Sequence, residues 1–446
     1  MQAPITLAVI GAGPKGLAIA AKRAALSEMG WEAPNLVLID RAGVAANWSG
    51  ASGFTDGRQP LNTPPEKDVG YPYPLSWGPD SGQVNDASHR WSWQSYLIHG
   101  GGLAEWVDRG QPRPSHGDWH RYLRWVAEQL RVEPVVAEVG GIDLAGGRWR
   151  LLGRRTATGA RLDLDCDGLV LTGPGTPLQV PGQPDNHPRI LDGRSFWTAT
   201  AELAAGGPVE VCVVGNGETA GSITTVLLGL LPEGSVIELV SEHGVLYTRG
   251  ESYSENRFYS DPDAAGWHQL AERHRREFLK RTDRGVFSVQ VQEVLDRVGV
   301  VRTLAGQVTR LEPVEAKVIV DVDYDGQRER LAFDWVVVAI GFDPLWFVPL
   351  LGRNVREALA TAIGVSPGRL PARAAMEQAI GHDLSVTGLQ PKLHLPTLAG
   401  LAQGPGFPNL SCLGLLADRI LGVYTSRLSR AATRDFGQEA ATGSRG

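Results

Sequence analysis

The sequence predicts an α/β fold made of two Rossmann-like dinucleotide-binding domains with a small, mostly helical insertion. Two similar stretches carry this prediction: "VIGAGPKG" begins at Val9, and "VVGNGETA" begins at Val213. In each, an apolar strand runs into closely spaced glycines and then into a helical pattern, which is the order of elements in a βαβ unit. A polar, aromatic stretch over 244–300 interrupts the second unit, and we expect this stretch to form the insertion.

Size and composition limit the classes of protein that fit. The chain has 446 residues, enough for two or more domains with their own cores. A net charge of -6 gives no reason to expect a nucleic-acid partner. The 3 cysteines lie far apart, which argues against a disulfide framework or a structural zinc site and suits a reducing cytoplasm. No secretion signal is evident, and no apolar run approaches the ~20 residues of a membrane span.

The first βαβ unit has the features of a flavin nucleotide site. We expect a buried strand, a helix over 15–26, and a second strand, "NLVLID", that ends at Asp40. Gly11, Gly13 and Gly16 fit the pattern G-x-G-x-x-G, in which the glycines allow a tight turn, close approach of a pyrophosphate, and close helix–strand packing. Asp40 is placed to accept a hydrogen bond from a ribose hydroxyl. Together these residues predict FAD.

The second unit has the features of a nicotinamide nucleotide site. Its turn residues are Gly215, Gly217 and Ala220, an accepted variant of the same pattern. The following strand ends at Ser241 rather than at an acid, although Glu242 follows; a serine can donate to a 2′-phosphate that a carboxylate would repel, which favours NADPH over NADH. Arg249 either adds positive charge there or is an ordinary solvated side chain. Gly341, in "VVVAIGFDP", marks a turn where a returning strand reaches a nucleotide.

We call the glycine turn at 11–16 the first cradle and the glycine turn at 215–220 the second cradle. Together they imply that the protein holds a flavin and a nicotinamide nucleotide at the same time. A disulfide reductase would need a redox cysteine pair, which the sequence lacks, so the remaining class is a reduced flavin that passes electrons to oxygen or to a small acceptor. The 10 histidines show no metal-ligand spacing. We therefore expect no metal and no catalytic side chain, because the flavin carries the chemistry.

Several stretches outside the glycine turns are more specific. "PLNTPPEKDVGYPYP", "SWQSYLI", "TDRGVFS" and "GFPNLSCLGLLADRIL" resemble the N-hydroxylating flavin monooxygenases of siderophore biosynthesis, the lysine and ornithine N-monooxygenases. The likeness is greatest to the mycobactin- and nocobactin-type L-lysine N6-monooxygenases. It implies FAD- and NADPH-dependent N6-hydroxylation of L-lysine, or of a lysine side chain in a siderophore precursor, by dioxygen through a C4a-hydroperoxyflavin.

The resemblance also implies roles for individual residues. "EKDV" points to Lys67 as the contact of the substrate α-carboxylate, against the alternative of a solvated loop lysine. In "SENRFYSDP" the acid and amide of the family pattern are exchanged, so Glu255 and Asn256 are both substrate-binding candidates. Asp283 stands where an asparagine is usual, and Ser411 faces substrate or flavin.

A further aromatic residue and the domain limits complete these expectations. Trp48, in "AANW", matches an aromatic beside the flavin. The expected segments are 1–190 (FAD-binding, first part), 191–243 (NADPH-binding, first part), 244–300 (substrate-binding), 301–365 (NADPH-binding, second part), 366–430 (FAD-binding, C-terminal part) and 431–446 (disordered tail). The alternatives are an N-hydroxylase of another amine such as ornithine, and a redox-silent flavin-binding module. A homo-oligomer, either a dimer or a tetramer, is left open.

Overall fold

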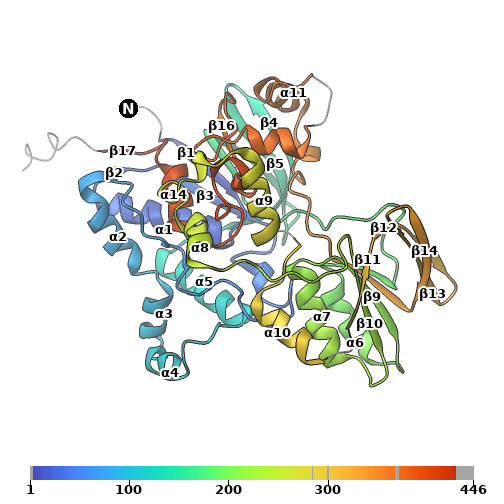
Figure 1. Ribbon diagram of the computed structural model, residues 1–446. Helices are drawn as coiled ribbons and strands as arrows, with labels where there is room; N and C mark the ends of the chain where they lie inside the picture. Colours follow the sequence, from blue (N-terminus) through green and yellow to red (C-terminus); the bar gives the residue numbers. More distant parts are fainter. Residues whose placement is uncertain (1–3, 284, 299–300, 367–370, 428–446) are drawn as a thin grey trace, which may run out of the picture.

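The chain folds around two separate β-sheets, as the sequence predicts (Figure 1). The computed structural model describes residues 4–283, 285–298, 301–366 and 371–427. The tail expected over 431–446 lies outside these residues. Within the described ranges, no helix is long and apolar enough to cross a bilayer.

The first sheet has seven strands in the order β16-β7-β1-β3-β4-β5-β6. Its strands are β1 (Thr6–Ile10), β3 (Asn35–Asp40), β4 (Val135–Ala145), β5 (Arg148–Arg155), β6 (Arg161–Cys166), β7 (Gly168–Leu171) and β16 (Lys392–His394). The first five strands in this order pair in parallel, and the last two extend the sheet as antiparallel strands. The parallel strands bring their carboxyl ends, including the end of β1 at the first glycine turn, to one edge of the sheet.

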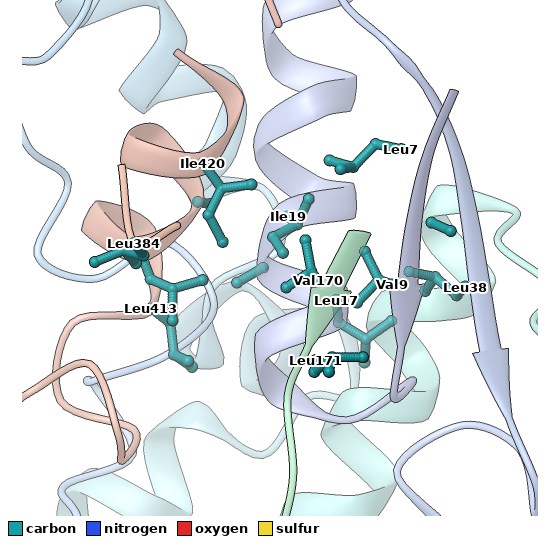
Figure 2. Close-up of a cluster of buried hydrophobic side chains, with 14 of the residues drawn as sticks. Leu7, Val9, Leu17, Ile19, Leu38, Val170, Leu171, Leu384, Leu413 and Ile420 are labelled. Atoms are coloured by element: carbon teal, nitrogen blue, oxygen red, sulfur yellow. The ribbon is translucent and has the colours of Figure 1, made fainter. Parts of the chain in front are cut away.

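Helices from both ends of the chain cover the first sheet. They are α1 (Pro14–Glu28), α2 (Ser81–His89), α3 (Trp93–His99), α4 (Leu103–Asp108), α5 (His116–Leu130) and α14 (Leu413–Leu421). Figure 2 shows side chains from β1, β3, β7, α1 and α14 meeting in one apolar cluster. A buried ion pair also joins α1 to α14: Nζ of Lys22 lies 3.0 Å from Oδ1 of Asp418. The C-terminal helix is therefore an integral part of the first domain.

The second sheet is fully parallel, in the order β11-β10-β9-β15-β8. Its strands are β8 (Ile190–Asp192), β9 (Glu210–Val214), β10 (Val236–Ser241), β11 (Val301–Ala305) and β15 (Trp335–Val338). Alternate residues of β9 serve two cores, as the two-residue period of a strand requires. Val211 and Val213 pack with helices, whereas Cys212 and Val214 pack with a small antiparallel sheet.

The two layers on this sheet differ in kind. The helices on one face are α6 (Phe196–Ala204), α7 (Glu218–Leu230) and α10 (Val289–Val298). The opposite face carries the three-stranded sheet β12 (Gln307–Val314), β13 (Lys317–Tyr324) and β14 (Gln327–Phe333), which lies at the outer end of the molecule in Figure 1. The sequence indicated a strand at β13 but not this separate sheet.

The insertion over 244–300 is mostly helical, but its helices pack in two directions. Its first helices are α8 (Tyr253–Ser260) and α9 (Glu272–Thr282), and they form an aromatic cluster around Trp267 with Leu401 of the C-terminal part. Its last helix, α10, packs against α7 of the second domain. The insertion thus bridges the two domains.

The remaining short elements complete the first domain. They are β2 (Trp31–Glu32), β17 (Ser426–Arg427), α11 (Arg353–Ala362), α12 (Arg373–Gln378) and α13 (Gly400–Gln403). Although α11 falls inside the expected NADPH-binding segment 301–365, its buried Val355 and Leu359 belong to the core of the first sheet. The domain limits stay a prediction, and the contacts of α11 favour a shorter second part.

Candidate active site

Each of the three glycines in the first glycine turn meets a different structural requirement. Gly11 has a φ of +119°, and a Cβ there would lie 2.0 Å from Oγ1 of Thr172. A Cβ on Gly16 would lie 2.3 Å from the carbonyl oxygen of Gly11, so α1 packs directly on the turn. Gly13 is the N-cap of α1, and a Cβ there would meet no atom within 4 Å. The space at Gly13 faces a helix N-terminus, which fits a nucleotide diphosphate.

Asp40 holds this turn in place from the end of β3. Its Oδ2 accepts a hydrogen bond from the backbone N–H of Ala12 at 3.1 Å. Its Oδ1 accepts from the N–H groups of Ala42 and Gly43 at 2.9 and 3.1 Å. A carboxylate offers about four acceptor sites, so the ribose contact expected for Asp40 stays a prediction beside a structural role that the sequence did not indicate.

Trp48 ends the short 3-10 helix η1 (Ala46–Trp48) and packs edge-on against His116, with ring centroids 4.8 Å apart. His116 shares a hydrogen bond of 2.9 Å between its Nδ1 and Oγ1 of Thr55. Burial lowers the pKa of His116 to about 4, so the ring is neutral at pH 7. These contacts anchor the loop of Trp48 on α5, and the position of Trp48 beside the flavin stays a prediction.

The second glycine turn borders a cavity of about 1170 Å³. Gly215 has a φ of +125°, and a Cβ there would lie 2.5 Å from the carbonyl oxygen of Ala339. Gly217 is the N-cap of α7, and Ala220 is fully buried where α7 meets the sheet. Ser241 and Gly341 line the same cavity. The turn and the ends of β10 and β15 therefore border one cavity, and contacts of these residues with a nucleotide stay a prediction.

The cations at this cavity come from an unexpected part of the chain. Lys280 and Arg281 of α9 and Arg373 of α12 line it. Arg249 is not among its lining residues, and Nη2 of Arg249 lies 3.7 Å from Oε2 of Glu218. The stretch "ERHRREFLKRT" gave a signal for a basic helix, but nothing local to it indicates that it faces the second turn. A role for Arg249 at the nucleotide stays a prediction.

Lys67, on a loop of the first domain, meets Asn256 of the insertion. Nζ of Lys67 donates a hydrogen bond to Oδ1 of Asn256 at 3.3 Å and lies 5.7 Å from the ring centroid of Tyr71. Burial lowers the pKa of Lys67. The loop and the insertion thus bring a partly buried ammonium and an amide together, which is a suitable pair for a carboxylate ligand.

Glu255 has a different role from its neighbour. It is the third residue of α8, where its carboxylate accepts a hydrogen bond from the N–H of Ser252 at 2.9 Å and its own N–H donates to Oγ of Ser252 at 3.3 Å. This reciprocal pair is a capping box, whose S-x-x-E spacing is visible in the sequence. Of the two candidates, Asn256 lies at Lys67 and Glu255 closes the first turn of the helix.

Asp283 and Ser411 lie in different parts of the structure, one at the cavity of the second glycine turn and the other just before α14. Asp283 caps the C-terminus of α9, donates its N–H to the carbonyl of Leu279 at 2.9 Å and lines the cavity. Ser411 is buried shortly before α14, and its N–H donates to Oδ1 of Asn409 at 2.9 Å. Substrate contacts by either residue stay predictions.

One charged group inside the first glycine motif escaped the sequence analysis. Nζ of Lys15 donates a hydrogen bond to the carbonyl oxygen of Pro408 at 2.7 Å, three residues before Ser411. Burial lowers the pKa of Lys15 to about 8, against the opposing influence of Cys412 and Asp283. A lysine in the helix that follows a glycine turn is commonly solvated, so only the fold reveals this cation.

Comparison with known proteins agrees with this geometry. The family model of L-lysine 6-monooxygenase/L-ornithine 5-monooxygenase matches residues 80–344. The L-lysine N6-monooxygenase MbtG of Mycobacterium sp. (strain MCS) is 44% identical over 424 residues, which cover 94% of both chains. The chain belongs to this monooxygenase family. The resemblance stated from the sequence is thereby confirmed, as is the α/β fold class.

Other members show the same relation. MbtG of Mycobacterium tuberculosis (strain ATCC 25618 / H37Rv) is 41% identical, again over 94% of both chains. The solved lysine monooxygenase NbtG from Nocardia farcinica is 40% identical with a TM-score of 0.81, over 94% of this chain and 100% of that one. The match therefore extends over nearly the whole chain.

Proposed function

We propose that this monooxygenase uses FAD, NADPH and dioxygen to hydroxylate the N6 atom of L-lysine, as a step in the assembly of a hydroxamate siderophore. One observation carries the proposal. In a chain 44% identical to an L-lysine N6-monooxygenase, the ammonium of Lys67 donates a hydrogen bond to the amide of Asn256, which the insertion supplies. The balanced reaction converts the amine, dioxygen, NADPH and a proton into the hydroxylamine, water and NADP⁺.

The first cradle would hold the FAD diphosphate at Gly13 and the N-terminus of α1, with Asp40 keeping the turn rigid. When bound there, the flavin supplies hydride acceptance and oxygen activation. The second cradle would hold NADPH in the 1170 Å³ cavity. Lys280, Arg281 and Arg373 could contact its phosphates, although four carboxylates, those of Glu218, Glu242, Glu277 and Asp283, line the same cavity.

The substrate would be oriented by its α-carboxylate. A partly desolvated ammonium binds a carboxylate more strongly than a solvated one, because the local dielectric is lower. Lys67 supplies that ammonium, and the amide of Asn256 keeps it in place. The substrate's side-chain amine then points away from Lys67, which keeps the two positive charges apart.

The side-chain amine must lose its proton before it can react, because only the neutral form has a lone pair. For a free lysine at pH 7 this deprotonation costs about 4.6 kcal/mol, from ~3.4 pKa units at ~1.36 kcal/mol each. Asp283 alone would oppose it by stabilising the ammonium. Lys15 lies within electrostatic reach of Asp283, and its positive charge offsets that effect.

The cellular setting belongs to the same proposal. Cys166, Cys212 and Cys412 are all free and buried, which is compatible with a reducing cytoplasm. Free lysine is the simplest substrate, and a lysine side chain in a siderophore precursor is the alternative form. A dimer or a tetramer is compatible with the proposal.

The test is a substrate comparison with purified, FAD-loaded protein. NADPH oxidation and hydroxylamine formation are measured with L-lysine, L-ornithine and an N-acyl lysine that keeps its side-chain amine free. We expect L-lysine to give the hydroxylamine more efficiently than the other two amines. Preference for L-ornithine would assign the chain to the ornithine branch, and peroxide without hydroxylamine from any amine would refute the proposed function.

A further inference from the structure

Glu218 lies where three parts of the chain meet. It is the first residue of α7, directly after Gly217, and it lines the nucleotide cavity. Its Oε1 accepts a hydrogen bond from Nδ2 of Asn62 at 2.5 Å. Ser288 donates to the same carboxylate twice, from its N–H at 2.8 Å and from its Oγ at 3.0 Å. With Arg249 at 3.7 Å, Glu218 joins α7 to the first domain and to the insertion.

Asn62 connects this carboxylate to Lys67. Asn62 lies two residues before a compact turn over 64–67, which is closed by a hydrogen bond of 2.9 Å from the N–H of Lys67 to the carbonyl of Pro64. The carbonyl of Asn62 is itself held by Nη1 of Arg113. Only four residues separate Asn62 from Lys67, and both ends of this segment are held by hydrogen bonds, so a shift of Asn62 is passed to Lys67 over a short stretch of chain.

Ser288 and Arg249 connect the carboxylate to Asn256. They lie on two segments that pair with each other: the N–H of Arg249 donates to the carbonyl of Phe287 at 2.7 Å, and the N–H of Phe287 donates to the carbonyl of Tyr247 at 2.9 Å. The segment that contains Arg249 leads directly into α8, which carries Asn256. The segments that lead to both members of the Lys67–Asn256 pair therefore contact Glu218.

We propose that Glu218 is a positioning residue that couples the binding of the nicotinamide nucleotide to the binding of L-lysine. This inference rests on the proposed function. A nucleotide diphosphate at the N-terminus of α7 brings negative charge close to the carboxylate of Glu218. The arrangement that best tolerates both charges is the one in which Asn62, Ser288 and Arg249 all contact Glu218.

The same arrangement places Lys67 beside Asn256. Glu218 is half-buried, and burial raises its pKa, while Arg249 and Ser288 oppose that rise by favouring the charged carboxylate. A nucleotide that stabilises the full set of contacts at Glu218 therefore also stabilises the carboxylate-binding pair. By thermodynamic linkage, L-lysine at that pair must favour the nucleotide in return.

The test measures the dissociation constant of NADP⁺ for the FAD-loaded protein by calorimetry, with and without saturating L-lysine. In the parent chain we expect L-lysine to tighten NADP⁺ binding about fivefold or more, with the reciprocal factor for L-lysine. In Asn62→Ala and in Glu218→Ala this factor should fall to about one. The double variant should lose no more coupling than either single variant, because the two residues act as a unit.

Controls separate this role from a structural one. Glu277→Ala removes another carboxylate from the cavity lining, on α9, and should retain the coupling factor. A merely structural loss would weaken NADP⁺ binding equally with and without L-lysine, leaving the ratio unchanged. Flavin content and a thermal melt check that each variant folds. If Glu218→Ala does not fold, Asn62→Ala still tests the coupling, because it removes one partner of Glu218 from a loop.

The outcomes are distinct. Parent protein that binds both ligands with no coupling, or Asn62→Ala with the full parent factor, would overturn the role of Glu218 and leave the proposed function intact. Parent protein that binds neither L-lysine nor NADP⁺ would refute the proposed function itself, and the role of Glu218 with it.

Discussion

The Nζ atom of Lys67 lies 3.3 Å from Oδ1 of Asn256, although the two residues are 189 positions apart in the chain. One is on a loop of the first domain and the other is on α8 of the insertion. No local sequence pattern dictates this contact, so it depends on how the insertion docks. If it forms the carboxylate site, substrate binding and domain arrangement depend on each other.

Replacing Lys67 tests the carboxylate site. Lys67→Ala should raise the KM for L-lysine roughly tenfold to a hundredfold, the loss expected for one charge-assisted hydrogen bond. Reduction of the flavin by NADPH should survive, because Lys67 contacts neither glycine cradle. Steady-state kinetics and anaerobic flavin bleaching measure the two effects separately. An unchanged KM would remove Lys67 from the site.

The neighbours Glu255 and Asn256 should respond in opposite ways. Asn256→Ala should raise the KM for L-lysine with little change in melting temperature. Glu255→Ala removes the capping box of α8, so it should lower the free energy of unfolding by about 1 kcal/mol and leave KM within about twofold. If Glu255→Ala instead raised KM without a loss of stability, the two roles would have to be exchanged.

Gly13 offers a direct test of the first cradle. Gly13→Val should give folded but colourless protein, because the structure accommodates a side chain at Gly13 while a pyrophosphate would collide with it. Gly229→Val is the matched control: Gly229 lies on the exposed face of α7, where an added Cβ also meets nothing within 4 Å. The control should stay yellow. A Gly13→Val protein with full flavin content would contradict the assignment of the first cradle.

Lys280 tests the charge of the second cradle. Lys280→Ala should raise the KM for NADPH about threefold to tenfold, and the effect should shrink at high salt because Lys280 is exposed and screened. Arg276→Ala, on the same helix but paired with Glu272, should leave this KM unchanged. Equal effects of both substitutions on the KM for NADPH would indicate a general electrostatic effect of the positive charge on α9 rather than a contact of Lys280 with the nucleotide.

Buried histidine should make the protein sensitive to acid. His394 is fully buried between the carbonyl of Asp383 and the hydroxyl of Tyr424, and burial lowers its pKa from 6.5 to about 4. Between pH 6.5 and pH 4, His394 is protonated in the unfolded chain but stays neutral in the folded chain. The contribution of neutral His394 to the free energy of unfolding is therefore complete above pH 6.5 and is lost as the pH falls towards 4. From pH 7 to pH 5 the loss is about 2 kcal/mol.

The measurement is urea unfolding of the parent chain and of His394→Gln at both pH values. The variant should be less stable at pH 7 but should lose less stability on acidification. Asp68 has the opposite dependence, because burial raises its pKa to about 6, and the comparison of parent and variant cancels its contribution. An identical pH dependence in both proteins would show that His394 does not titrate as its burial indicates.

The sequence was sufficient for the parts of the site that are encoded locally. Both glycine turns occupy their expected places because each motif lies within one strand–turn–helix unit, where spacing alone determines geometry. The S-x-x-E spacing at Ser252 could also have shown in advance that Glu255 caps α8. Lys67 and Asn256 came from the family resemblance, residue by residue.

Other features depend on contacts that no local pattern records. The contact of Lys15 with Pro408 joins residues 393 positions apart, and that of Asn62 with Glu218 joins residues 156 apart. The cations of α9 reach the second cradle only because the insertion folds back across the cavity. These long-range contacts depend on tertiary packing, which composition and periodicity do not determine.

The central claim is that this chain uses dioxygen to oxidise the side-chain nitrogen of L-lysine. The most direct measurement is mass spectrometry of the product formed from L-lysine, NADPH and ¹⁸O₂ by the FAD-loaded protein. We predict N6-hydroxylysine that carries one labelled oxygen atom. Unmodified lysine with labelled hydrogen peroxide as the sole oxygen product would contradict the claim.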